Sequence, residues 1–324
     1  AVTNCRNIGE VQAKDWGNIS SDEKAKQIQH GCGGIVGILK NNPTTITNCI
    51  NDGRVRTWAC TAAGIAGNVQ KEGCSLSEVY NYGEVKNTGA GGLSNSIYCS
   101  HLTDGTSING VLEKEFLNAM YTTNPDPENA DTTNAAINAD TSIVSVTKDI
   151  VGYSDARVVG VDLTNVPSIS DYSAEGTEFK ISTPDELKAF IKGNATAARS
   201  GYEGKTIYLA NDIDMQKQKM MVTDLSGSDS YSFKGTFDGQ GYEIKNLNIT
   251  GLDASNKMNG GIGLFRYAAG NATIKNLILS GTIEGLNQTG AFVGNPRGKI
   301  TIENCYNKCE VKGNGGYVGG FVGM

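Results

Sequence analysis

Three aspartates are the candidates for acid–base chemistry in this chain. Asp212 and Asp214 share one face of a short predicted strand, and Asp238 falls in the next repeat. Carboxylates clustered on a sheet face can transfer protons during polysaccharide cleavage. Asn-Asp-Ile-Asp and Asp-Gly-Gln-Gly are also favourable corner sequences. We therefore interpret the aspartates as corner residues, assign no catalytic residue and expect the chain not to be an enzyme.

Histidine and cysteine form no metal-binding pattern. His30 and His101 lie near Cys32 and Cys99, but a zinc site needs about four N or S ligands at close spacing. The sequence has no phosphate-binding loop and no GxSxG, HExxH or calcium-loop string. We predict neither a metal nor a cofactor.

The eight cysteines fall into two groups. Those in the repeated apolar position described below are expected to be small buried hydrophobes, although a strained bridge between adjacent repeats stays open. Cys309 replaces a turn glycine and could form an intermolecular bond. A disulfide of unknown pairing is an open alternative among three others, which are Cys60, Cys74 and Cys99.

The composition excludes several classes of protein. A length of 324 residues allows one large domain or two modest ones. The net charge of −6 argues against nucleic acid or an anionic membrane as the main partner. No apolar run reaches the ~18 residues of a transmembrane helix.

Two motifs repeat along the chain and predict its architecture. The first has Asn, an apolar residue, Asn at position four, Gly at position six and Val or Ile at position eight, as in the segments starting at Asn4 and Asn48. The segment starting at Asn304 has the same pattern with Cys309 in place of the glycine. The second is a string such as Gly33-Gly34-Ile35-Val36-Gly37 or Gly319-Gly320-Phe321-Val322-Gly323. Each copy holds short β-prone runs separated by Gly and Asn, with no ten-residue helical stripe.

Such a unit cannot bury its apolar face alone, whereas stacked copies can. We therefore predict an all-β fold, a parallel β-helix (β-solenoid), with like positions stacked ~4.8 Å apart. Asn at positions one and four suits corners, and its amide can pair with the next copy. The inward stacking slot is predicted to hold Cys5, Cys49, Val79, Leu247, Leu277 and Cys305.

The Gly-Gly-Ile-Val-Gly and Gly-Gly-Phe-Val-Gly strings resemble GLUG-motif repeats, as does the run from Phe233 to Leu247. The resemblance covers roughly residues 1–102 and 176–324. It implies a β-helical fold in a large bacterial surface or secreted protein. The family has no shared catalytic residue to carry over.

The order of the parts is unusual. Residues 1–120 are predicted to be solenoid coils that end in a helical cap at Val111–Met120. Residues 121–175 are predicted to be a linker or small β region, with two or three strands in Ile143–Val166. Residues 176–324 are predicted to open with a capping segment, including a helix over about 184–192, and to continue as coils. The solenoid thus forms two segments with short capping helices.

Both chain ends fall inside a coil, so both are expected to leave an open face that templates another strand. Because the faces come from one repeat family, they should fit head to tail, and contacts that do not close give filaments. The alternative is excision from a longer protein. About half a turn is missing between the joined ends, so either residues were lost or the faces meet as a non-covalent stack. The beginning at Ala1 fits a trimmed chain or a mature secreted protein. The predicted self-assembly residues are Val2, Thr3, Asn4, Cys5, Phe321, Val322 and Gly323.

The sequence therefore predicts an extracellular or cell-surface structural or adhesive protein, with head-to-tail fibre assembly and a host or matrix glycan or protein as further partner. The alternative is a glycan-binding or polysaccharide-cleaving β-helix. Four tyrosines could line one flank and stack on sugars, although such residues are more often half-buried. They are Tyr80, Tyr82, Tyr98 and Tyr306.

Overall fold

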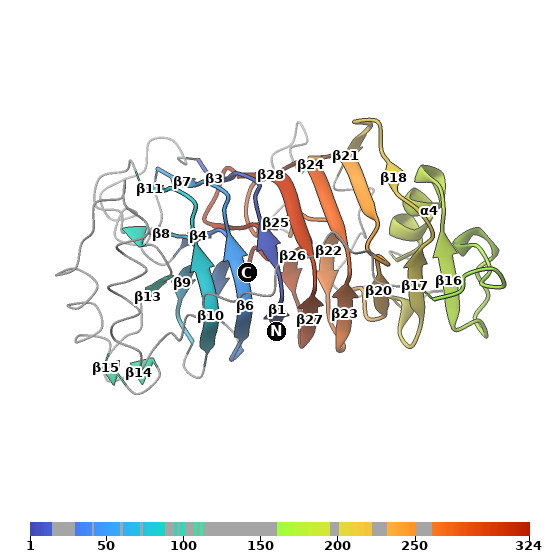
Figure 1. Cartoon of the computed structure of the whole chain (residues 1–324), viewed down its shortest axis with the longest axis horizontal. Helices are drawn as coiled ribbons and strands as arrows, with labels where there is room; N and C mark the ends of the chain where they lie inside the picture. Colours follow the sequence, from blue (N-terminus) through green and yellow to red (C-terminus); the bar gives the residue numbers. More distant parts are fainter. Residues whose placement is uncertain are drawn as a thin grey trace.

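Parallel β-sheets make up most of the molecule, and the predicted all-β class is confirmed (Figure 1). The computed structural model describes residues 1–14, 30–40, 42–58, 61–71, 74–87, 94–95, 98–100, 107–108, 111–112, 161–194, 201–221, 232–250 and 261–324. Within these ranges the helices are η1 (Ile169–Asp171) and α4 (Pro184–Asn194).

The largest sheet has two neighbouring strips of strands, connected by corners at which the chain turns. Pairing partners are parallel and in register, and each passage of the chain through the sheets is called a rung below. In stacking order, the first strip is β16 (Glu178–Ile181), β17 (Thr206–Leu209), β20 (Thr236–Asp238), β23 (Ala272–Lys275), β27 (Ile300–Glu303), β1 (Val2–Thr3), β6 (Thr45–Asn51) and β10 (Ser75–Asn81).

The second strip continues from the same rungs after the corner. It contains β18 (Ile213–Asp214) and β19 (Lys219–Met221), β21 (Glu243–Thr250), β24 (Ile278–Gly285), β28 (Tyr306–Gly313), β2 (Arg6–Asn7) and β3 (Val11–Ala13), β7 (Val55–Thr57) and β11 (Val85–Asn87).

Shorter strands complete each rung. One sheet has the order β25 (Thr289–Gly290), β29 (Tyr317–Gly319), β4 (Gly31–Gly33), β8 (Thr61–Ala63) and β12 (Ser94–Asn95). Two further sheets are β22 (Phe265–Ala268) with β26 (Val293–Pro296), and β5 (Val36–Leu39), β9 (Ala66–Val69) and β13 (Tyr98–Ser100). An antiparallel pair is formed by β14 (Ser107–Ile108) and β15 (Val111–Leu112).

Alternation of the side chains puts the core between the sheets. In β28 the exposure alternates along the strand, with the inward residues buried. The buried apolar side chains form one cluster that runs from Ile169 and Phe179 through both predicted solenoid segments to Val85 and Tyr98. The segments predicted as 1–120 and 176–324 therefore share a continuous core.

Asparagine at position four forms a buried ladder through the core. Asn51 donates from Nδ2 to Asn81 Oδ1 at 2.7 Å and accepts from Asn7 Nδ2 at 2.7 Å. Its amide also donates to the Gly53 carbonyl at 2.8 Å, so the side chain closes its own turn. All three asparagines are fully buried. The predicted pairing between amides of adjacent copies is confirmed.

Helix α4 lies in the predicted capping segment and begins at Pro184, where the sequence predicts the start of a helix. Thr183 Oγ1 accepts from the Glu186 amide at 3.2 Å, while Glu186 Oε2 accepts from the amides of Ser182 and Thr183 at 2.6 and 3.1 Å. Pro184 occupies the first helical position, where a missing N–H costs nothing. The buried ring of Phe190 then enters the core at this end of the stack, beside Tyr202, Phe233, Phe237 and Phe265.

One secondary-structure prediction differs from the structure and another is tested only in part. Val111–Leu112, predicted to begin a helix, form a strand paired with Ser107–Ile108, and residues 113–120 lie outside the described residues. Residues 121–175 are predicted to be a linker or small β region, and the strands predicted in Ile143–Val166 fall mostly on residues outside the described part of the chain. Residues 161–175 contain no strand; Ile169 is buried there and Ser168 pairs with Lys180 of β16. Residues 121–160 lie outside the described part of the chain.

Replacing one ladder asparagine tests how much the buried amides stabilise the stack. In Asn51→Ala, Asn7 Nδ2 and the Asn81 acceptor lose a buried partner, which we expect to lower the free energy of unfolding by about 2–4 kcal/mol. Urea unfolding measures the change. Ser75→Ala, which removes an exposed 3.3 Å bond to Thr45, is the control and should change it by less than about 0.5 kcal/mol. Equal effects of both substitutions would contradict this role of the ladder.

Candidate functional site: the seam between the chain ends

The two ends of the chain lie side by side in the middle of the stack. β1 pairs in parallel with β27 on one side and with β6 on the other, so the first rung of the sequence is also the continuation of the last (Figure 1). The contact between β1–β4 and β27–β29 is called the seam below. Its register joins Val2 to Ile302 and Thr3 to Glu303.

Backbone hydrogen bonds cross the seam at several points around the rung. At the corner between the two strips, the Asn304 amide donates to the Thr3 carbonyl at 3.0 Å and the Arg6 amide donates to the Cys305 carbonyl at 3.1 Å. On the opposite side, Phe321 donates to the Ile35 carbonyl at 2.8 Å. The buried amide ladder crosses as well, because Asn307 Nδ2 donates to Asn7 Oδ1 at 2.7 Å.

The glycine-rich motif meets its own copy at the seam. Val322 forms parallel bridges with Val36 above and Val293 below. A Cβ on Gly320 would lie 2.0 Å from the Gly34 carbonyl oxygen, so only glycine lets the backbones approach this closely. The ring of Phe321 is fully buried and stacks on Phe292 with centroids 4.7 Å apart.

The prediction of open faces is wrong for this chain. The residues assigned to self-assembly lie in intramolecular pairs, because the last rung finds its complementary partner within the same polypeptide. This applies to Val2, Thr3, Asn4, Cys5, Phe321, Val322 and Gly323. Head-to-tail contact through these faces would require the seam to form between two chains instead of within one.

A column of thiols occupies the predicted slot at the seam. Cys5, Cys49 and Cys305 are buried and free, and Cys49 pairs in register with Val79. Each thiol donates to a carbonyl of an adjacent rung, at 3.6–3.8 Å. Burial raises the pKa of the Cys5 and Cys49 thiols well above the ordinary value, which keeps them protonated and unreactive. They are small core residues, as the sequence indicated.

One predicted slot residue belongs elsewhere. Leu247 is buried, but it lies in register with Gly281 and not with Leu277, which retains its place at the corner. The Asp-Gly-Gln-Gly turn lies beside the Asn276 corner, since Gly241 donates to the Asn276 carbonyl at 2.8 Å, so Leu247 falls further along the second strip. Gln240 there has a left-handed φ of 53°, comparable to the 52° of Asn276.

The three candidate aspartates each serve a corner. Asp238 is buried, accepts from Asn276 Nδ2 at 3.0 Å and pairs with Lys275 at 3.4 Å. Asp214 accepts from Asn246 Nδ2 at 2.9 Å, and this bond, followed by one from the Gln216 amide, lowers the pKa of its carboxyl. Asp212 accepts from the Glu243 amide at 3.0 Å. Each carboxylate thus stabilises a turn.

The other candidate groups are also buried or engaged. Cys309, predicted to be available to another chain, is fully buried beside Gly281, and burial raises its thiol pKa. Cys74 is a free thiol, while Cys60, Cys99 and His101 lie outside the residues whose side chains are described. Among the described residues, no cluster of three His, Cys, Asp or Glu side chains could hold a metal ion. In the same ranges, no helix is long and apolar enough to span a bilayer.

The predicted tyrosine flank is only partly formed. Tyr98 and Tyr80 are buried, which removes their faces from solvent. Tyr82 is 52% exposed and stacks on Tyr80 with ring centroids 5.8 Å apart. Tyr306 lies in the same column as Tyr80 but is separated from it by Arg6 and Ile50.

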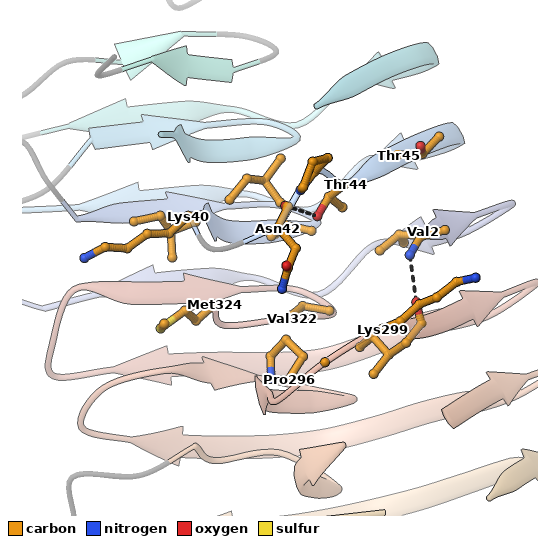
Figure 2. Close-up of a pocket in the computed structure, with 16 residues that line it drawn as sticks. Val2, Lys40, Asn42, Thr44, Thr45, Pro296, Lys299, Val322 and Met324 are labelled. Atoms are coloured by element: carbon orange, nitrogen blue, oxygen red, sulfur yellow. Dashed lines mark hydrogen bonds between the residues drawn. The ribbon is translucent and has the colours of Figure 1, made fainter. Parts of the chain in front are cut away.

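A cavity of about 410 Å³ opens beside the seam. Figure 2 shows Lys40 and Thr44 on one wall, Pro296 and Lys299 on the other, and Met324 between them. The amine of Ala1 donates to the Ile300 carbonyl at 2.7 Å. The lining residues come from both chain ends and from residues 36–45 and 296–300, which only the fold brings together.

Comparison with known proteins returned no family model, no curated protein and no solved structure that matches this chain.

Acid should weaken the seam through His30. Its ring lies 4.8 Å from Tyr317 across the seam, and burial together with the charge of Lys40 lowers the pKa of His30. The folded chain therefore binds fewer protons than the unfolded chain, and stability falls as the pH drops through the unfolded pKa of ~6.5. We expect unfolding midpoints in urea to fall more steeply between about pH 7.5 and about pH 5 in the parent than in His30→Gln. Parallel curves would contradict this assignment.

Proposed function

We propose that this chain is an extracellular structural and adhesive repeat protein, built as a parallel β-solenoid of the GLUG-repeat type. The observation that carries the proposal is the uninterrupted parallel register of the first strip, which continues from β16 to β10 and includes the chain ends. A stack in which each rung is held by both neighbours is rigid, because opening one rung breaks two ladders of hydrogen bonds.

A mechanical role also agrees with the use of the polar residues. The asparagine amides bond to adjacent rungs and the aspartates bond to corners. Polar groups committed to the framework in this way favour a scaffold over a reaction centre. The extracellular location rests on the resemblance of the Gly-Gly-Ile-Val-Gly and Gly-Gly-Phe-Val-Gly strings to repeats of surface and secreted proteins.

Fibres would form if the seam contacts were made between two chains and not within one. The faces that close within one chain are complementary, so the same pairing can form between the last rung of one copy and the first rung of the next. Exchange of identical contacts adds no new interface and is favoured by high protein concentration. We propose this exchange as the route to head-to-tail filaments.

A cysteine pair across the seam distinguishes closed monomers from exchanged chains. Thr3 is half-buried, Glu303 is exposed, and the two residues are partners in register across the seam. Adjacent strands place such partners within the ~4.4–6.8 Å Cα separation that a disulfide requires. The variant T3C/E303C is refolded at increasing protein concentration and then oxidised. If chains exchange the seam, we expect a ladder of disulfide-linked oligomers on non-reducing gels. The control T45C/S75C joins partners inside one half and should stay intrachain. An exclusively intrachain bond in T3C/E303C at every concentration would overturn exchange.

The adhesive proposal is distinguished from its enzymatic alternative by a polysaccharide panel. Because Asp212, Asp214 and Asp238 support corners, we expect no new reducing ends after prolonged incubation with any polymer. Retention on immobilised glycans without cleavage would support adhesion, and the half-exposed Tyr82 is the aromatic to replace in that case. Cleavage that disappears in Asp212→Asn would show that the chain is an enzyme.

A further inference from the structure

The bend between β28 and β29 contains an Asn-Gly pair whose reactive groups are unengaged. Asn314 and Gly315 follow β28 and precede β29, and Asn314 is partly exposed to solvent. The backbone amide of Asn314 donates to the Gly285 carbonyl at 2.9 Å. Within the described part of the chain, no hydrogen bond engages the Asn314 side chain or the Gly315 amide. The side chain and the next backbone nitrogen are therefore free to approach each other.

An asparagine followed by glycine can react with its own main chain. The Gly315 nitrogen loses its proton and bonds to the Asn314 side-chain carbonyl carbon, Cγ, and the side-chain nitrogen leaves as ammonia. The product is a cyclic imide, a succinimide. Water then adds to one of its carbonyl carbons and breaks the bond from that carbon to nitrogen, which gives aspartate or isoaspartate. Glycine favours the attack, because it has no Cβ to hinder the nitrogen.

The fold blocks the same reaction at comparable pairs. The described part of the chain also contains Asp52-Gly53 and Asp238-Gly239, which could form the same imide with loss of water. In both, the glycine amide donates to a carbonyl of a neighbouring rung, at 3.1 Å from Gly53 and 2.9 Å from Gly239. Such an amide reaches the preceding side chain only after its hydrogen bond breaks. The amide of Gly315 has no such bond to break.

The neighbouring rung explains why glycine follows Asn314. Asn287 lies beside this bend, and its Oδ1 accepts from the Gly316 amide at 3.2 Å. A Cβ on Gly315 would lie 2.0 Å from the same oxygen, so a larger residue there would displace Asn287. Asn287 itself is followed by Gln288, and its side chain is held by this contact. The packing around Asn287 thus requires the glycine that makes Asn314 reactive.

We propose that Asn314 is a site of spontaneous deamidation, and that the isoaspartate formed there loosens the contact between β29 and β4. Directly after the reacting pair, the Gly316 carbonyl accepts from the Gly31 amide at 2.7 Å. Isoaspartate adds a carbon to the main chain between residues 314 and 315, which moves Gly316 relative to Gly31. The reaction needs only water, so the inference is independent of the adhesive role proposed above.

Peptide mass spectrometry of the full chain, aged in mildly alkaline buffer with or without urea, tests the reaction. In the folded chain we expect deamidation at Asn314 to be at least ~10-fold faster than at Asn287. Folding should slow isomerisation at Asp52 by at least ~10-fold and slow the reaction at Asn314 by less than ~3-fold. Equal modification of Asn314 and Asn287, or equal protection of Asn314 and Asp52 by folding, would overturn the proposal.

Hydrogen exchange of the Gly31 amide, measured by NMR, tests the structural effect. In the isoaspartate fraction of the aged chain, we expect this amide to exchange at least ~5-fold faster than in the fresh chain. Aged Asn314→Gln, which resists ring closure, should retain the slow exchange. Freshly prepared Asn314→Asp adds the charge without the extra main-chain carbon and should also exchange slowly. Unchanged exchange in the isoaspartate fraction, or equally fast exchange in fresh Asn314→Asp, would contradict loosening by the lengthened main chain.

Discussion

Parallel backbone pairing between successive rungs is the constraint on which this structure depends. A strand in the middle of such a stack has its N–H and C=O groups satisfied only when both neighbours are in register. Register then decides which side chains meet, so each buried position becomes a column, as with Cys305, Cys5 and Cys49. The buried asparagine ladder strengthens the same register, because an amide displaced by one rung position would lose its partners in an apolar interior.

This constraint also explains why the chain ends lie in the middle. The rung ending in Val322 and the rung beginning at Val2 each need a partner, and the nearest complementary surface is the other end of the same chain. An intramolecular partner has a high effective concentration, so the closed form is favoured over contact between copies. On one side of the seam a cavity lies between β26 and β5, and its lining includes Lys40 and Lys299.

The polar residues of the chain are used mainly to hold the framework. Asp238 bonds to Asn276 and Lys275, and Asp214 bonds to Asn246. The lowered pKa of Asp214 has the same origin, since hydrogen bonds to its charged form stabilise the turn. A perturbed carboxylate can thus mark a structural corner as well as a reaction centre, and the bonding partners distinguish the two.

The sequence by itself determined the all-β class, the capping box before α4, the buried cysteine position and the pairing of asparagine amides. These follow from local propensity and from repetition at a fixed period, both of which can be read without coordinates. The position of Leu247 could not be read, because the Asp-Gly-Gln-Gly turn takes the corner of this rung and leaves the Asn-Leu string further along the strand, where Leu247 lies opposite Gly281. Tertiary structure alone decided that the two ends pair with each other, since repeats that match in sequence fit equally well within a chain or between chains. The cavity beside the seam is likewise visible only in the tertiary structure, because its lining residues come from segments that are far apart in the sequence.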